Sequence, residues 1–331
     1  MRHCFDHSAT QVDSPKRHHL LQSTPTKISI ILFSAVALIT ACGSDAGYDF
    51  ADMPTGVEGD SSSISSTVDS SLTRDDVDCS AAGLGEDKTS TFITAHYVVG
   101  GVLGATCFGD ADPALIQAWE ILSIITPSPQ LADLGLFGSF KSTEGGDEVT
   151  LAFVNALDDD STFFQMSINL DPFKEDPNEA FLTLAHEFSH VLTALPSQIN
   201  RSVESEDKCA TYDNGEGCYL PNSFMALWVT LFWGDGLVDE IDPSEGANGD
   251  AGLDRCSINP GFLGPYAASS PEEDFAESFS AFVFQLDAGT DAVQAKLDWM
   301  SEQPGLVEFR NRAVIAGIGP LENNFEPCGE G

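Results

Sequence analysis

Apolar residues recur with two spacings along this chain, which predict strands and helices in the first half of the folded part and helices alone in the second. The predicted strands are 91–99, 149–154 and 163–170, the last two joined by a turn at 158–161. The predicted helices are 113–125, 177–195, 224–233, 271–286 and 291–315, with an acidic loop between 233 and 254. Strands followed by a series of helices indicate an α+β fold.

The helix expected at 177–195 combines a well-marked start with an uncharged interior. Asp176 is a typical N-cap, a proline follows it, and Glu179 is placed to complete a capping box. Further along, the residues that flank and separate the two histidines of His186-Glu187-Phe188-Ser189-His190 are uncharged. This pattern predicts a helix that is buried on most of its surface.

A His-Glu-x-x-His pattern on a helix is typical of zinc enzymes. His186 and His190 lie one turn apart on one face, where two neutral imidazoles can chelate one zinc ion. Glu187, between them, is placed to take a proton from a zinc-bound water. Only three histidines follow Cys42, so composition alone rarely produces the pattern. The alternative is a solvent-exposed histidine pair on an ordinary amphipathic helix.

A catalytic zinc ion needs a third protein ligand and an open fourth position. Thr193 excludes the metzincin spacing and no further histidine lies nearby, so the ligand should be a carboxylate. Glu273 is the preferred candidate, and Glu277, one turn further on the same helix, can accept a hydrogen bond from a ligating imidazole. The alternative is that Glu273 serves only as the capping-box partner of Ser270.

Other acidic features compete for a metal. Asp239, in Gly-Leu-Val-Asp, has the spacing of zinc proteases that use an aspartate ligand, and Glu240 adjoins it. The acidic loop Asp242–Asp254 has the composition of a structural Ca²⁺ site, but its spacing does not match an EF-hand loop. A solvated surface loop is therefore the alternative interpretation of this segment.

The His-Glu-Phe-Ser-His run together with Glu-Asp-Phe-Ala-Glu-Ser-Phe at 273–279 resembles the gluzincin metallopeptidases. It is most similar to bacterial zinc-binding peptidases with a Glu-Asp-Phe-Ala-Glu-x-Phe element, and more distantly similar to the catalytic domain of anthrax lethal factor. The resemblance implies a zincin-like α+β domain with a small mixed sheet, one catalytic Zn²⁺ and Glu273 as the third ligand. It also implies that Tyr266, seven residues before Glu273, stabilises the oxyanion. The implied reaction is hydrolysis of peptide bonds in a protein or peptide substrate.

Two other functions are compatible with these residues: a zinc amidase that acts on cell-wall material, and a non-catalytic surface lipoprotein that keeps the fold. Glu187 argues against the second, because zinc binding alone does not need that base. The strand at 163–170 is a candidate for the edge strand that pairs with an extended substrate. His96, on the strand at 91–99, is expected to be structural.

The N-terminal part has the pattern of a bacterial export signal. Basic residues precede the uncharged segment 28–41, which is followed by Cys42 in a sequence that resembles a lipobox. We expect 1–42 to be a lipoprotein signal peptide, 43–78 a flexible tether, and 79–331 one metallopeptidase domain. A plain secretory signal is the alternative to lipidation at Cys42. The expected location is the cell envelope, at the outer membrane or cell surface.

Six cysteines follow Cys42. An even number in an exported chain favours disulfides, and Cys209–Cys218 is the preferred pair because it closes a turn-rich loop. A cysteine-based zinc cluster is the alternative, but no Cys-x-x-Cys spacing supports it. Three of the cysteines lie between His190 and Glu273, which indicates a disulfide-tied insertion that shapes substrate access.

The charge of the chain restricts its partners. Of 14 basic and 52 acidic residues, four basic and two acidic ones precede Cys42, which leaves ten and fifty and a net charge near −40. A negative field of this size repels nucleic acid and anionic lipid. We therefore expect no nucleic-acid partner, and contact with a membrane only through the lipid anchor.

Overall fold

A computed structural model of the chain describes the folded part and leaves out most of the N-terminal region. The described residues are 36–38, 68–80, 83–84, 90–142, 148–173, 176–203, 206–234, 236–241, 249–323 and 325–329. The lipidation candidate Cys42 lies outside them, as do 43–67 of the predicted tether and 242–248 of the acidic loop.

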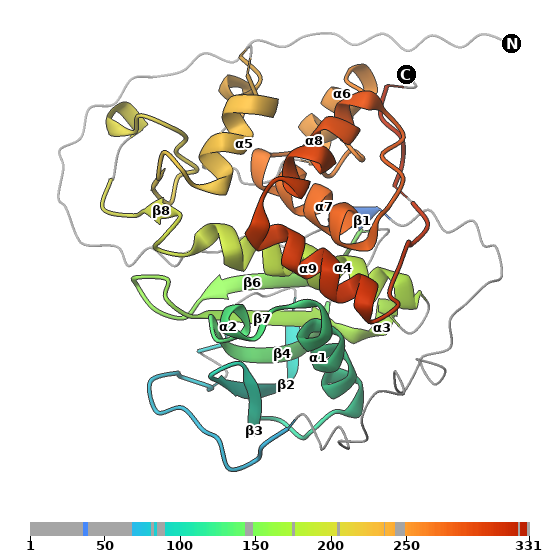
Figure 1. Cartoon of the computed structure of the whole chain (residues 1–331). Helices are drawn as coiled ribbons and strands as arrows, with labels where there is room; N and C mark the ends of the chain where they lie inside the picture. Colours follow the sequence, from blue (N-terminus) through green and yellow to red (C-terminus); the bar gives the residue numbers. More distant parts are fainter. Residues whose placement is uncertain are drawn as a thin grey trace, which may run out of the picture.

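A five-stranded mixed sheet forms one layer of the molecule, in the order β3-β2-β4-β7-β6 (Figure 1). Its strands are β2 (Ser90–Val99), β3 (Val102–Phe108), β4 (Leu134–Ser142), β6 (Ala152–Ala156) and β7 (Phe164–Asn169). β4 and β7 run parallel, and the other neighbouring pairs are antiparallel. Two small antiparallel pairs accompany it: β1 (Val36–Leu38) with β5 (Glu148–Thr150), and β8 (Ile199–Asn200) with β9 (Cys218–Tyr219).

The edge strand differs from the one expected from the sequence. β7, which corresponds to the predicted strand 163–170, lies between β4 and β6, so its backbone groups pair on both sides. The edge strand on this side of the sheet is β6, which forms a hairpin with β7 as the turn at 158–161 predicted, and β3 is the other edge. The residue pattern could not separate the two, because both strands carry apolar residues and are buried along much of their length, and pairing with neighbouring strands leaves no mark on the pattern of one strand.

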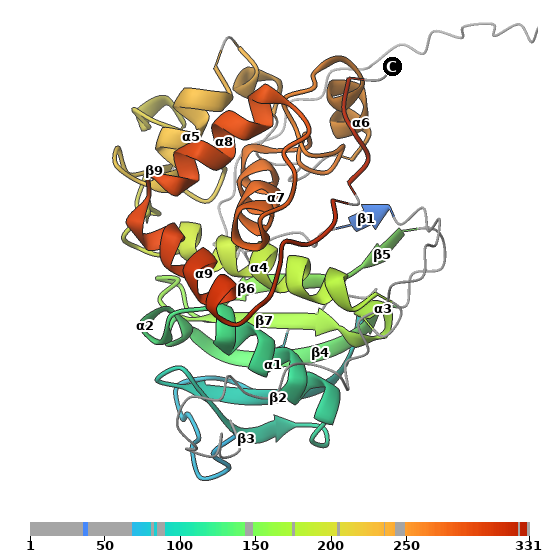
Figure 2. The same ribbon diagram turned by 45° about the vertical axis from the view of Figure 1, so that its right-hand side comes forward.

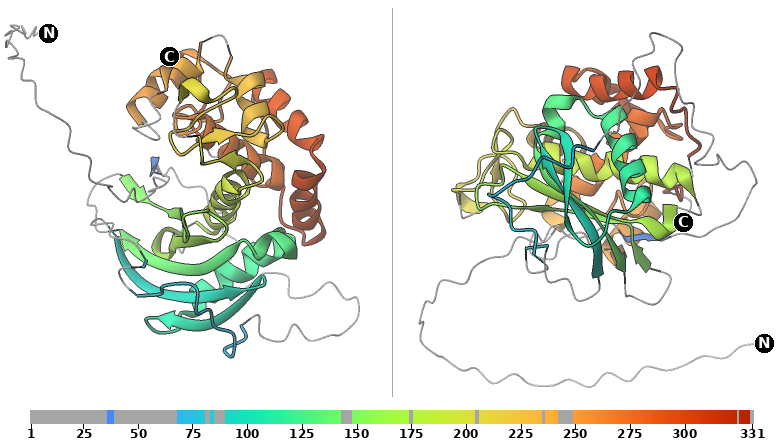
Figure 3. Two further views of the ribbon diagram at one scale, coloured as in Figure 1. Left: turned by 90° about the vertical axis from the view of Figure 1, so that its left-hand side faces the viewer. Right: turned by 90° about the horizontal axis from the view of Figure 1, so that it is seen from below.

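Nine α-helices are described, and most of them lie on one side of the sheet. They are α1 (Pro113–Ile125), α2 (Ser128–Leu131), α3 (Leu170–Phe173), α4 (Pro177–Ala194), α5 (Phe224–Phe232), α6 (Gly249–Ile258), α7 (Pro271–Phe284), α8 (Asp291–Ser301) and α9 (Pro304–Ile315). α4 packs against α1 and the sheet on one side and against α7 on the other (Figures 2 and 3). The fold is therefore α+β, as expected.

Two helix predictions need correction. The acidic loop does not extend to Asp254, because α6 begins at Gly249 within it. The terminal helical region is two helices, since α9 begins at Pro304, whose ring has no amide hydrogen to continue α8. Both differences concern short helices. Such helices are stabilised by tertiary contacts more than by a long repeating pattern of apolar residues, so the sequence marks their ends poorly.

The core explains why α4 is almost uncharged. Phe188 is fully buried, and its ring lies 5.7 Å from Phe309 of α9, which in turn lies 5.2 Å from Phe279 of α7. Each buried phenylalanine contributes on the order of 2 kcal/mol of hydrophobic stabilisation. The metal-motif helix is thus held in the centre of the domain by apolar packing from both neighbouring helices.

The opposite face of the sheet is covered by the segment before β2. Val77, Cys79 and Leu84 form a small second core with Ala95 and Leu136. Residues 68–78, which the sequence assigned to the tether, are folded as well: Val68 is bridged to Leu103 of β3, and Val77 belongs to the small second core. The folded part therefore includes these residues.

All six cysteines after Cys42 form disulfides: Cys79–Cys107, Cys209–Cys218 and Cys256–Cys328. The preferred Cys209–Cys218 pair is confirmed, and the cysteine-based metal cluster is excluded. Three disulfides favour an extracytoplasmic location, where thiols are oxidised. A membrane-spanning helix is absent from the part of the chain that the structure describes.

Candidate metal centre

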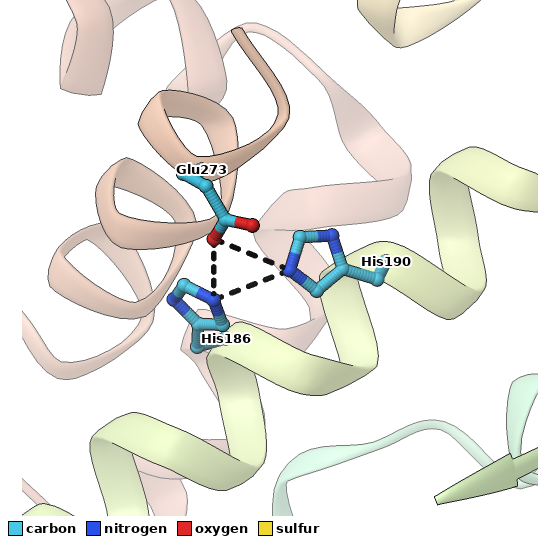
Figure 4. A group of neighbouring side chains, drawn as sticks. All are labelled: His186, His190 and Glu273. Carbon is cyan, nitrogen blue, oxygen red and sulfur yellow. Dashed lines mark hydrogen bonds and ion pairs between the residues drawn. The ribbon is translucent and has the colours of Figure 1, made fainter. Parts of the chain in front are cut away.

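Two helix starts position the predicted metal ligands. The Asp176 side chain accepts a hydrogen bond from the Asn178 amide and caps α4, and the Ser270 hydroxyl accepts one from the Glu273 amide and caps α7. The two caps fix where each helix begins and hence which side chains face each other. Figure 4 shows the result: Glu273 points from α7 toward the two histidine rings of α4.

His186, His190 and Glu273 converge on one point, although Glu273 is far from the histidines in sequence. His186 Nε2 lies 3.2 Å from His190 Nε2 and 3.0 Å from Glu273 Oε2, and His190 Nε2 lies 3.6 Å from that same oxygen. We call these three atoms the ligand triangle. Four ligands placed about 2.0–2.2 Å from a tetrahedral ion are about 3.3–3.6 Å from one another. The ligand triangle therefore fits three corners of such a site.

The charge balance at the ligand triangle also suits a cation. Burial alone would raise the pKa of Glu273, but the neighbouring charge of His190 and the hydrogen bond from His186 lower it far below its ordinary value. Burial alone would lower the pKa of His186, but hydrogen bonds to Glu273 and Glu277 raise it well above its ordinary value. The buried carboxylates at this site are stabilised by nearby positive charge. A metal ion supplies that charge while both imidazoles stay neutral.

Glu277 occupies the supporting position expected for it. Its Oε1 lies 3.1 Å from His186 Nδ1, and the His186 side chain is 4% exposed. A proton held on Nδ1 by this carboxylate leaves the Nε2 lone pair directed into the ligand triangle. Glu277 therefore sets both the tautomer and the ring orientation of one ligand.

Glu187 and Tyr266 each carry a buried polar atom that has no hydrogen-bond partner among the described residues: Glu187 Oε1 and the Tyr266 hydroxyl. The Tyr266 ring centroid lies 5.9 Å from that of His186. Burial raises the pKa of Glu187, and burial together with the charge of Glu273 raises the pKa of Tyr266 well above its ordinary value. Unpaired buried polar atoms are costly, and of the twelve among the described residues these two belong to the predicted catalytic groups.

No known protein family, curated protein or solved structure matches this chain. The assignment of the site therefore depends on its own geometry.

The competing acids do not join the ligand triangle. Asp239 is exposed on a short 3₁₀ helix (Val238–Glu240), and Glu240 forms an ion pair with Arg255 at 3.4 Å. The predicted Ca²⁺ loop lies partly outside the described residues, and α6 takes up its last part. His96 is buried with Nδ1 3.0 Å from the Gly104 carbonyl oxygen, which fits the structural role expected for it.

The sequence analysis missed a contact between the metal centre and the disulfide-tied insertion. The Tyr212 hydroxyl donates a hydrogen bond of 3.1 Å to Glu272, the residue immediately before the ligand Glu273. Burial raises the pKa of Glu272 to about 7. Tyr212 lies between Cys209 and Cys218, so the predicted insertion does reach the first turn of α7. No local pattern around Tyr212 could have identified a partner 60 residues away.

Proposed function

We propose that this protein is a zinc-dependent metallopeptidase of the gluzincin type with a zincin-like fold. The observation that carries the proposal is the ligand triangle of His186, His190 and Glu273, with Glu187 and Tyr266 beside it as buried groups whose polar atoms are free to act on a substrate. Two imidazoles and one carboxylate, with a fourth position open, are the ligand set of catalytic rather than structural zinc.

The chemistry follows from the position of each group. A zinc ion held by His186, His190 and Glu273 would supply a polarised water molecule with a pKa near neutrality. Glu187 accepts the proton of this water as it attacks a peptide carbonyl, and then delivers the proton to the leaving amine. Tyr266 donates its phenolic hydrogen to the carbonyl oxygen as negative charge develops there, and its raised pKa keeps that hydrogen in place.

The position of the edge strand β6 favours a peptide over a small molecule as the substrate. It contacts α4, and its outer side has no strand partner among the described residues. An extended polypeptide can add to such an edge through main-chain hydrogen bonds. β6 replaces the strand at 163–170 as the substrate-binding edge in this proposal.

The proposed setting is the cell envelope. The disulfides favour export, and we propose that Cys42 carries the lipid that anchors the protein there. The high negative charge disfavours nucleic acid and anionic lipid as partners. The proposed partners are therefore peptides, and the proposed contact with the membrane is through the lipid alone.

The test is zinc content and hydrolysis of the full-length protein, produced in an oxidising compartment and assayed on fluorescently labelled casein. We expect one zinc ion per chain, and Glu187→Gln should keep the zinc while losing at least about 100-fold in hydrolysis, as expected for loss of a general base. Glu302→Gln, an exposed residue beside the end of α8, is the matched control.

A parent protein without zinc, or a Glu187→Gln variant with unchanged hydrolysis, contradicts the proposal. A zinc-containing parent that leaves casein intact but releases fragments from purified cell wall would move the activity to the amidase class, with the same groups acting.

A further inference from the structure

Asp274, the residue that follows the ligand Glu273, is fully buried at the centre of a polar cluster. Its Oδ2 accepts hydrogen bonds from the indole nitrogens of Trp228, at 3.0 Å, and Trp233, at 2.8 Å. Its Oδ1 lies 2.6 Å from Lys296 Nζ, which also donates to the Gly261 carbonyl oxygen at 2.6 Å. Both carboxylate oxygens are therefore held, by three donors from two separate segments. We call Asp274, Trp228, Trp233 and Lys296 the Asp274 clamp.

The Asp274 clamp joins elements that are distant in sequence. Trp228 belongs to α5, Trp233 directly follows that helix, and Lys296 belongs to α8. The Lys296 side chain is 4% exposed, and its ammonium lies 4.3 Å from the ring centroid of Phe262. Water is thus excluded from the ion pair, which strengthens the attraction between its charges.

The clamp acts on α7 at the place where rotation would most disturb the metal ligand. Consecutive residues of a helix point about 100° apart, so holding the Asp274 side chain fixes the direction of the Glu273 side chain. With side chains about 5–6 Å from the helix axis, a rotation of 10° moves a carboxylate by about 1 Å. Metal–ligand distances tolerate only about 0.2 Å. The Ser270 cap fixes where α7 begins, and the clamp fixes how it is turned.

We propose that Asp274 and Lys296 are positioning residues for the metal ligand Glu273. The inference rests on the proposed zinc site and deepens it. A buried ion pair commonly adds little stability over apolar residues of the same size. What the pair adds here is a single orientation of the first turn of α7, because a carboxylate held by three fixed donors, with both of its oxygens engaged, has one low-energy placement.

The test compares zinc affinity with stability in Asp274→Asn, Lys296→Met and the double variant, all in the full-length protein. The dissociation constant for zinc is measured by competition with a chelator, and stability by urea unfolding of the zinc-free protein. Each single variant should bind zinc about 10- to 100-fold more weakly, the loss typical of groups that support a metal ligand. The double variant, with no unpaired buried charge, should recover stability but not zinc affinity.

Arg74→Met is the control, because Arg74 is a partly buried cation, paired with the exposed Asp76 at 2.6 Å and stacked on Phe163, but it contacts the sheet and not α7. It should lose stability and keep the zinc affinity of the parent.

Folded single variants that bind zinc within threefold of the parent would overturn the inference. So would zinc affinities that follow stability through the whole series, Arg74→Met included. If the single variants do not fold, the zinc affinity of the double variant alone decides between the two outcomes. A parent that binds no zinc refutes the proposed metal site itself, whereas normal zinc binding by folded clamp variants refutes only the clamp.

Discussion

Glu277 is the only described carboxylate that contacts the Nδ1 side of His186, so its removal tests how the metal centre is oriented. The contact is 3.1 Å long, between side chains that are 4% and 13% exposed. Glu277→Ala would leave the Nδ1 hydrogen without its acceptor and the ring free to turn about its own bond. The prediction is weaker zinc binding with the fold intact, because no core side chain is lost.

The size of the effect follows from the contact. A hydrogen bond to a charged acceptor contributes about 1.5–3 kcal/mol, and each 1.4 kcal/mol is a factor of ten in affinity. The Glu277 side chain is 13% exposed, so water can reach the site and partly replace the carboxylate. The lower part of that range therefore applies, and we expect about 10- to 30-fold weaker zinc binding. Glu277→Gln keeps an acceptor at the same place and loses only its charge, so its effect should be smaller.

The assay is competition for zinc between the full-length protein and a chromogenic chelator at neutral pH. The expected order of dissociation constants is parent, then Glu277→Gln, then Glu277→Ala, with Glu302→Ala equal to the parent. A Glu277→Ala variant that binds zinc within twofold of the parent would refute the reasoning, because the orientation of His186 would then not depend on this carboxylate.

Two further predictions concern stability. Burial raises the pKa of the half-buried Asp133 from 3.8 to about 6, so the folded state loses stability as pH rises from about 4 to 6. The shift corresponds to about 3 kcal/mol, which solvent screening at this half-buried site reduces to about 1 kcal/mol. Asp133→Asn should therefore raise the free energy of unfolding by about 1 kcal/mol at pH 7 and leave it unchanged at pH 4. Equal effects at both pH values would contradict this. Cys256 and Cys328 are joined across a sequence separation of 72, so replacing both with alanine should lower the free energy of urea unfolding by about 4 kcal/mol, and a loss below 1 kcal/mol would contradict the chain-entropy argument.

The local features of the metal centre were predictable from the sequence because each depends on residues within one turn of a helix. The Asp176 cap, the His186–His190 spacing and the uncharged positions around them are such features, and α4 (Pro177–Ala194) matches the expected 177–195 almost end to end. The cysteine count likewise favoured disulfides over a metal cluster, and the short Cys209–Cys218 loop was identified because its ends cannot separate far.

The rest was decided by tertiary structure, because it depends on contacts between distant segments. The sequence offered Glu273 and Asp239 as competing ligands, and only the packing of α7 on α4 brings one of them to within 3.0 Å of a histidine. β4 was missed because a strand buried on both faces has no alternation to detect, and the edge position of β6 is a property of the whole sheet. The placement of Asp274 among donors from α5 and α8 has the same origin: a sequence specifies the groups, but only the fold determines which of them share a buried site.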